Sequence, residues 1–189
     1  MTYKYIAFYK PYGVVSQFSG EGRTLSDFNL PAGVYAAGRL DKDSEGLLIL
    51  TDDGPFIKKL TDPKFEKDKI YWVQVEGEPD PDSIDLLKSG VTIKGKRTRP
   101  CQAKLLETTL VDEVILQRDP PVRFRANIPT SWLEITLNEG MNRQVRRMCA
   151  SVGYPCLRLI RKQVGLYKLE SLKEGEWISA NRNEILESK

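Results

Sequence analysis

The feature that most limits the fold of this sequence is a short apolar run from Gly46 to Thr51, with four consecutive large aliphatic side chains. A run of this length without polar alternation is typical of a strand that is buried on both faces. The elements expected around it are short strands and helices in mixed order, without regular strand–helix–strand alternation. The pattern therefore favours an α+β fold with an antiparallel or mixed sheet over a doubly wound fold.

Residue type and turn signals predict the individual elements. Strands are expected at 5–9, 46–51, 70–75, 101–106, 113–118, 132–137, 156–160 and 177–180, and helices at 24–28, 53–60, 81–89 and 142–152. In the last helix Asn142 is the expected cap, and an apolar stripe runs from Val145 to Val152. Arg143 and Arg147 then fall on the opposite face, with Arg146 on the flank.

The absence of histidine removes the largest number of functional classes. With none among 189 residues, histidine-based triads and histidine metal sites are excluded. Acid–base chemistry must then rest on Asp, Glu, Lys, Tyr or Cys. Cys101, Cys149 and Cys156 show no CxxC spacing, so reduced thiols packed in or near the core are expected.

Length and hydropathy predict a single domain, or two closely packed lobes, in the cytoplasm. A chain of 189 residues is of single-domain size. No apolar run approaches the roughly 20 residues that a membrane span needs. The first residues lack the layout of a signal peptide and already belong to the expected folded domain, so neither secretion nor a membrane partner is expected.

Basic residues are unevenly distributed although the net charge is only +3. The stretch from Gly140 to Leu169 contains no Asp or Glu, and a second cluster comprises Lys94, Lys96, Arg97 and Arg99. Such runs are either solvated faces or surfaces that bind a polyanion. The residues alone leave both interpretations open.

The segment from Gly38 to Gly46 carries three carboxylates and permits three interpretations. In a calcium loop, Asp41, Asp43 and Glu45 would be ligands, but Asp52 would stand where a bidentate Glu is required. The segment could instead be a polar turn before a core strand. It could also present a catalytic carboxylate, kept ionised by one of the chain's arginines.

Four stretches, in family order, resemble the motifs of pseudouridine synthases of the small-subunit rRNA group. They are Lys10-Pro11-x-Gly13, Gly38-Arg39-Leu40-Asp41-x-Asp43-Ser44-x-Gly46-Leu47-Leu48, Lys69-Ile70-Tyr71-x-Val73 and Glu139-Gly140-Met141-Asn142-Arg143-Gln144-Val145-Arg146-Arg147-Met148, the last followed by Leu157-Arg158-Leu159-Ile160-Arg161 and Gly165. The motifs span nearly the whole chain. The segment 128–133, and the lack of a preceding RNA-binding domain, indicate a subfamily acting on large-subunit RNA.

The resemblance implies the pseudouridine synthase fold. This fold has a central mixed, mainly antiparallel sheet in two lobes, with a basic cleft between them, here in one catalytic domain at 1–189. The resemblance also implies that Asp41 is the catalytic aspartate, that Tyr71 stacks on the target base and that Arg146 ion-pairs with the aspartate. Arg39 is expected to hold RNA around the flipped nucleotide, and Leu159 to line the uracil pocket.

Further RNA contacts are expected from Leu40, Lys69, Arg143, Arg147, Arg158 and Arg161, and from basic loops at 94–99 and 118–125. The implied reaction breaks the N1–C1′ bond, turns the uracil and joins C5 to C1′, with no metal, redox cofactor or nucleotide. The expected partner is 23S ribosomal RNA or a precursor particle, bound by a monomer. Rival interpretations are an inactive RNA-binding module of the same fold and a glycosidase or nucleosidase that uses Asp41 with Glu45.

Overall fold

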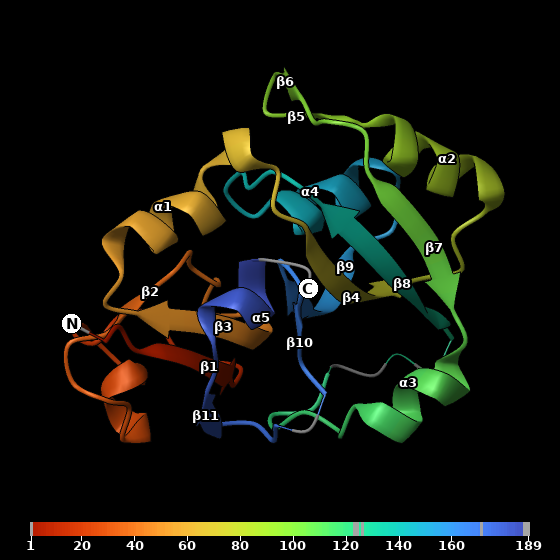
Figure 1. Ribbon diagram of the computed structural model, residues 1–189. Coiled ribbons are helices and arrows are strands. Elements are labelled where there is room, and N and C mark those ends of the chain that lie inside the picture. The colour runs from red at the N-terminus through yellow and green to blue at the C-terminus, as the bar shows by residue number, and fades with distance from the viewer. Residues whose placement is uncertain (1, 123–124, 126, 171, 187–189) are drawn as a thin grey trace. The chain divides into compact units, whose positions relative to one another are not determined.

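The computed structural model describes residues 2–122, 125, 127–170 and 172–186. Its strands and helices form an α+β fold in which most strand pairs are antiparallel, as the sequence predicts (Figure 1). The chain divides into two compact units, Met1–Lys69 with Ile160–Lys189, and Ile70–Leu159. The boundaries fall within β4 (Lys69–Glu76) and β9 (Cys156–Val164), so both strands contribute to both units.

The first unit is built around β3. Its strands are β1 (Tyr5–Lys10), β2 (Tyr35–Ala36), β3 (Glu45–Thr51), the end of β9, β10 (Tyr167–Lys168) and β11 (Trp177–Ser179). The order is β11-β1-β3-β9, with β2 also paired to β3 and β10 to β9. β1 runs antiparallel to β3, whereas β3 and β9 are parallel. All seven residues of β3 are buried, which confirms the expectation of a strand covered on both faces.

Among its described residues, the helical segments of this unit are η1 (Leu25–Phe28), α1 (Gly54–Thr61), η2 (Pro63–Phe65) and α5 (Arg182–Leu186). α1 begins where its sequence predicts, because the carboxylate of Asp53 accepts a 3.0 Å hydrogen bond from the Phe56 amide. Pro55 occupies the first turn. Phe56 and Leu60 bury the inner face of the helix in a core shared with Leu47 and Ile49 of β3.

In the second unit β4 pairs with β8 (Thr130–Leu137), and β8 pairs with β7 (Gln102–Leu106). A separate hairpin is formed by β5 (Thr92–Ile93) and β6 (Lys96–Arg97). The helices are α2 (Pro81–Ser89), α3 (Thr108–Val114) and α4 (Gln144–Ser151). The core of this unit joins Val73 and Val75 of β4 with Ile135 of β8, and with Val145 and Met148 of α4.

Two local predictions are wrong. The strand expected at 113–118 is instead the end of α3 and the loop after it. Val111 and Ile115 are the buried residues there, and their spacing of about one turn marks a helical face rather than a strand. Asn142 does not cap α4. The residue at the cap position is Arg143, whose side chain makes no capping hydrogen bond, and the Gln144 side-chain oxygen instead accepts a 2.8 Å hydrogen bond from the Met141 amide before the helix.

The cysteines behave as the sequence predicts. Cys101, Cys149 and Cys156 are free thiols, Cys149 being buried and the other two half-buried. Burial raises the pKa of the Cys101 thiol to about 11, so this thiol is protonated at neutral pH. No helix in the described part of the chain combines the length and the apolar composition that crossing a membrane requires.

Candidate active site

Asp41 lies in a tight turn that leads directly into β3. The Ser44 amide donates a 3.0 Å hydrogen bond to the Asp41 carbonyl oxygen, which closes the turn. The buried Ser16 hydroxyl donates a hydrogen bond to the Leu40 carbonyl oxygen at 2.8 Å, and the Leu40 amide donates one back to the Ser16 hydroxyl oxygen at 3.1 Å. These bonds fix the backbone on both sides of the half-buried Asp41 side chain.

Lys10 supports the neighbouring turn from inside the first unit. Its side chain is 0% exposed, and its Nζ donates to the carbonyl oxygens of Pro11 at 2.9 Å and Val14 at 2.7 Å. The same segment reaches the Asp41 turn, because the Gly13 amide donates to the Lys42 carbonyl at 2.8 Å. The motif Lys10-Pro11-x-Gly13 thus braces the turn that presents Asp41.

Several charges surround Lys10. Burial lowers the pKa of Lys10 to about 8, and the positive charge of Arg161 acts in the same direction. Glu45 opposes this shift in the pKa most strongly, followed by Asp43 and Asp41. The motif carboxylates and Arg161 therefore share one electrostatic neighbourhood around a buried lysine.

Arg161 lies on β9 beside the start of β3. Its side chain is 3% exposed, and its Nε donates a 2.8 Å hydrogen bond to the Leu47 carbonyl. Gly46 faces it so closely that no larger residue would fit without a backbone shift. Lys69 is half-buried nearby, with its Nζ 2.9 Å from the Lys67 carbonyl oxygen. Burial, followed by the charge of Arg161, lowers the pKa of Lys69 to about 8.

The second unit contains three of the predicted site residues, Tyr71, Arg146 and Leu159. Tyr71 on β4 is half-buried and packs on the same core as the buried Leu159. Arg146 lies on α4 between Val145 and Met148, which are both fixed in that core. One of its terminal nitrogens lies 3.4 Å from the Cys156 carbonyl oxygen. The direction in which α4 presents Arg146 is therefore set by apolar packing on either side.

A carboxylate that the sequence did not single out organises the start of α4. The Gln144 side-chain nitrogen lies 2.6 Å from Glu139 Oε1, and this oxygen also accepts a 3.0 Å bond from the Arg99 amide. Glu139 and Gln144 are both buried. Ser16, Lys10 and these two residues are polar groups that position others. The only sequence signal for them is their place in or beside a motif.

The basic residues separate into exposed and buried groups. Arg39 and Arg143 are exposed, and Arg147 is half-buried with a 2.7 Å hydrogen bond to the Asn142 side chain. Arg158 is 4% exposed and donates to the Leu116 carbonyl at 2.9 Å. Arg158 therefore does not belong to a solvated face, one of the two interpretations of the basic run, because its guanidinium donates to a backbone carbonyl inside the unit.

The basic loop expected at 118–125 is only partly described, because residues 123–124 lie outside the described residues. In the described part, Arg118 Nε donates to the Pro120 carbonyl at 2.8 Å. Arg125 forms an ion pair of 2.9 Å with Glu76. Both side chains thus have partners within the protein, which weakens the case for this loop as an RNA contact.

The structure contradicts the calcium interpretation of the acidic segment. Glu45 already belongs to β3, so the chain is an extended buried strand where a calcium loop would have to continue turning. No group of three or more potential ligand residues is arranged to hold a metal ion within the ranges that the structure describes. The alternative of a turn that presents a carboxylate fits the observed backbone.

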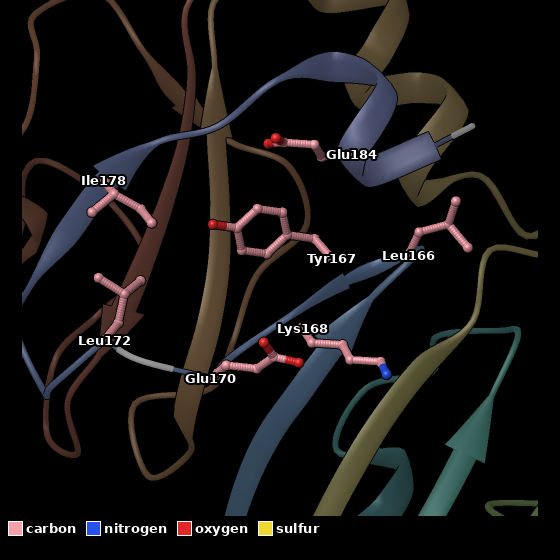
Figure 2. Close-up of a pocket in the computed structure, with 7 residues that line it drawn as sticks. All are labelled: Leu166, Tyr167, Lys168, Glu170, Leu172, Ile178 and Glu184. Atoms are coloured by element: carbon pink, nitrogen blue, oxygen red, sulfur yellow. The ribbon is translucent and has the colours of Figure 1, made fainter. Parts of the chain in front are cut away.

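A pocket in the first unit is lined by two acidic side chains and one basic side chain. It is lined by Leu166, Tyr167, Lys168, Glu170, Leu172, Ile178 and Glu184, none of which is a predicted site residue. Figure 2 shows the Tyr167 ring between the side chains of Glu184 and Glu170. Burial raises the pKa of Tyr167, and the charges of Glu184 and Glu170 add to this. Two carboxylates at one ring repel phosphate groups.

Comparison with known proteins identifies related sequences and folds. The model of a protein family described as RNA pseudouridylate synthase matches residues 4–151. Ribosomal large subunit pseudouridine synthase E of Xanthomonas campestris pv. campestris is 54% identical over 172 residues, covering 89% of this chain and 90% of that protein. The protein of the same name from Vibrio vulnificus is 53% identical over 176 residues, covering 92% of this chain and 74% of that protein.

A solved structure agrees with these sequences. A crystal structure of a pseudouridylate synthase superposes with a TM-score of 0.79 at 27% sequence identity, covering 97% of this chain and 72% of that chain. The mixed, mainly antiparallel sheet expected from the motifs is thus confirmed as the architecture of this chain.

Proposed function

Because this chain belongs to the RNA pseudouridylate synthase family, we propose that it isomerises one specific uridine of large-subunit (23S) ribosomal RNA to pseudouridine. As a member of this family, the chain is an RNA-binding isomerase. The choice of large-subunit RNA follows the names of relatives that are 54% and 53% identical to this chain over 172 and 176 aligned residues. The observation that carries the proposal is the braced turn that presents Asp41 at the start of β3.

Asp41 is the catalytic carboxylate in this proposal. It is half-buried, so its oxygens can reach a substrate while the surrounding backbone stays fixed. The hydrogen bonds at Leu40 and Ser44 hold the residues on either side of it. A carboxylate held in this way is positioned before the substrate arrives, which lowers the cost of reaching the reactive geometry.

Arg146, Tyr71 and Leu159 complete the proposed chemistry. Arg146 supplies the positive charge that keeps Asp41 ionised once RNA has excluded water. Tyr71 stacks on the flipped uracil, and such stacking contributes about 1–3 kcal/mol. This offsets part of the few kcal/mol that extruding a base costs. Leu159 provides an apolar surface against which the detached uracil turns, and its position in the core of the second unit supports this role.

The proposed reaction balances without any other reactant. The N1–C1′ bond breaks, the uracil turns, C5 bonds to C1′, and the proton that C5 carried is released as N1 gains one. Product and substrate have the same composition and oxidation state, so neither a redox cofactor nor a nucleotide is consumed. The proposal includes no catalytic metal.

Phosphate contacts hold the RNA in this proposal. Arg39 and Arg143 are exposed and able to reach phosphates, and the half-buried Arg147 follows Arg143 by one turn on α4. Leu40, Lys69 and Arg161 act closer to the base, and the burial of Arg161 suits a supporting position beneath the substrate. Basic side chains of this kind offset the cost of base flipping through phosphate contacts.

We further propose that the two units act as one catalytic domain, in a monomer, on 23S RNA or on a precursor particle. The family match covers most of both units and supports their joint action. A cytoplasmic location follows from that substrate, since bacterial ribosomes are assembled there. Isolated RNA and precursor particles, offered in parallel to the same enzyme, distinguish the two forms of the substrate.

Product analysis tests the isomerase proposal against its rivals. The purified protein is incubated with large-subunit RNA, and the RNA is then mapped for pseudouridine and weighed by mass spectrometry. Isomerisation gives one new pseudouridine and an unchanged RNA mass. A glycosidase or nucleosidase using Asp41 with Glu45 would release free base, and an inactive RNA-binding module would bind the RNA and leave it unmodified.

A further inference from the structure

The β5–β6 hairpin carries an unusual concentration of positive charge. From Leu86 to Leu106 the chain contains no Asp or Glu and six basic residues. Two of them, Lys94 and Lys96, are exposed at the tip of the hairpin and form no ion pair with any described residue. Figure 1 shows the hairpin projecting at one end of its unit. Its two lysines are therefore available to a ligand with negative charge.

The tip of the hairpin is a tight two-residue turn. Thr92 pairs with Arg97 and Ile93 with Lys96, which leaves only Lys94 and Gly95 to connect the strands. Both connecting residues have positive φ, 50° at Lys94 and 75° at Gly95. This is the geometry of a type I′ turn, in which asparagine followed by glycine is the favoured pair. The chain thus places a lysine where local conformation favours asparagine.

The base of the hairpin is fixed to the rest of its unit. Ile93 and Thr98 are 4% and 3% exposed. The Thr98 amide donates to the Val91 carbonyl at 2.9 Å, and the Val91 amide donates to the Thr98 hydroxyl at 3.0 Å. A guanidinium nitrogen of Arg97 donates to the Ser89 carbonyl at 3.2 Å. The lysines are therefore carried by a preformed support, which reduces the entropy lost when a ligand binds.

Glu139 connects the hairpin to the start of α4. Its Oε1 accepts hydrogen bonds from the Arg99 amide, just beyond β6, and from the Gln144 side chain, in the first turn of α4. Arg143 is exposed at the residue that precedes this helix. One buried carboxylate thus links two basic elements within the same unit.

The chemistry of the hairpin selects the class of ligand. Between Val91 and Pro100 there is no aromatic side chain. Proteins that bind single strands usually stack bases on aromatic rings, whereas RNA stems are recognised through phosphates and 2′-hydroxyl groups. A rigid hairpin with lysines and no stacking platform therefore suits the backbone of an RNA stem.

We propose that the β5–β6 hairpin is a preformed arm that binds backbone phosphates of an RNA stem beside the target uridine. Glu139 holds this arm in register with the arginines at the start of α4. The identity of the ligand as RNA rests on the proposed function, whereas the position and charge of the arm do not. The arm supplies affinity for structured RNA that the site around Asp41 does not provide.

The test measures equilibrium binding of a fluorescein-labelled RNA stem-loop with one uridine in its loop. The variant Lys94→Asn/Lys96→Gln removes both charges and gives the turn its favoured asparagine, so loss of folding is not expected. Affinity at about 0.1 M salt falls on the order of tenfold or more, and the slope of log K against log salt decreases by about 1.4–1.8. An unstructured RNA of the same composition shows a smaller loss.

Two exposed lysines of the same unit serve as matched controls. Lys88 pairs with Asp85 at 2.8 Å and Lys104 with Glu134 at 3.0 Å. The variant Lys88→Gln/Lys104→Gln makes the same change in net charge, and it should fold normally because surface ion pairs contribute little to stability. It should leave RNA affinity within about twofold, because both lysines are already paired with carboxylates of the protein. An equal loss in this control would show a general charge effect and overturn the proposal.

Glu139 provides an independent test of the connection. Removing the negative charge of this buried carboxylate beneath a basic surface should tighten RNA binding if charge alone matters. Glu139→Ala instead weakens binding because it frees the arm, whereas Glu139→Gln keeps an acceptor oxygen and retains affinity. Tighter binding by Glu139→Ala would overturn the connecting role. Unchanged affinity and salt slope in the tip variant, or equal losses on stem-loop and unstructured RNA, would overturn the arm itself.

These readouts require no turnover. A failed arm proposal therefore leaves the isomerase proposal intact. Conversely, wild-type protein that binds RNA without forming pseudouridine would contradict the proposed function and leave the binding result standing.

Discussion

Gly46 and Arg161 approach each other so closely across the parallel pair β3–β9 that a Cβ atom on Gly46 would lie 2.4 Å from the Arg161 carbonyl oxygen. The obstructing atoms are backbone, so a side-chain rotation cannot relieve the clash. Gly46 also has a φ of 104°, which L side chains rarely adopt. The glycine of the Asp41 motif thus allows β3 to lie against β9 directly after the turn that carries Asp41.

Gly46→Ala should therefore destabilise the first unit strongly. Gly33→Ala is the matched control, because Gly33 has a φ of 82° but a Cβ there would meet nothing within 4 Å. Both variants carry the cost of positive φ, about 1–2 kcal/mol. Only Gly46→Ala adds the clash, so its free energy of unfolding in urea should fall by at least about 2 kcal/mol more. Equal losses in the two variants would show that β3 can shift without cost.

Lys10 should give stability a specific dependence on pH. Burial lowers its pKa in the folded protein to about 8 from 10.5. Between these values the unfolded chain binds more protons than the folded chain, so this lysine makes stability rise with pH. Below pH 8 the lysine is charged in both states, and the full cost of burying the charge persists.

The comparison uses Lys10→Met, which lacks the titrating group. The free energy of unfolding of the wild type, relative to the variant, should increase from about pH 7 to about pH 9.5. Tyr5, whose pKa is raised to about 12, contributes equally to both proteins and cancels. Parallel pH profiles of the two proteins would contradict the burial of a proton-binding amine at position 10.

Gln144 should stabilise the start of α4. Its side chain accepts a hydrogen bond from the Met141 amide and donates one to Glu139, both inside the unit. Gln144→Ala removes both bonds and leaves a half-buried amide and a buried carboxylate without these partners. The free energy of unfolding should fall by roughly 1–2 kcal/mol. Gln102→Ala, at an exposed position of β7, should change it by less than about 0.5 kcal/mol.

Tyr71 should act through its ring. Tyr71→Phe keeps a stacking surface and most of the single-turnover rate, whereas Tyr71→Ala should lower the rate about 5- to 150-fold, as expected for loss of 1–3 kcal/mol of stacking. Thermal unfolding of both variants separates this effect from core packing, because Tyr71 also packs on the second unit's core. Equal rates for Tyr71→Ala and the wild type would remove the ring from the mechanism.

Elements with strong local signals could be predicted from the sequence. α2 spans Pro81–Ser89 as expected, because Asp80 caps it, Pro81 begins it and Gly90 ends it. β3 was recognisable from its continuous apolar run. α3 was missed because Val114, Ile115 and Leu116 have the composition of a strand, although Val114 and Leu116 are exposed.

The candidate site could be proposed from the sequence only where its residues belong to motifs. Ser16 is hydrogen-bonded to Leu40, 24 positions away in the sequence, and Glu139 to Arg99, 40 positions away. Hydrogen bonds over such separations produce no local sequence pattern from which they could be predicted. The burial of Arg158 and Arg161 was equally hidden, because a basic run shows charge but not which side chains turn inward. Such contacts depend on strand pairing and helix packing that form only in the folded chain.

The central claim is that Asp41 performs the chemistry, and tritium release from RNA labelled at C5 of uridine measures this most directly. Asp52→Asn is the control, since Asp52 is an exposed carboxylate of the same unit outside the motif. In single-turnover reactions at saturating RNA, wild type and Asp52→Asn should release tritium at similar rates. Asp41→Asn should bind the RNA and release tritium at least about a thousandfold more slowly. Release by Asp41→Asn at the wild-type rate would contradict the account.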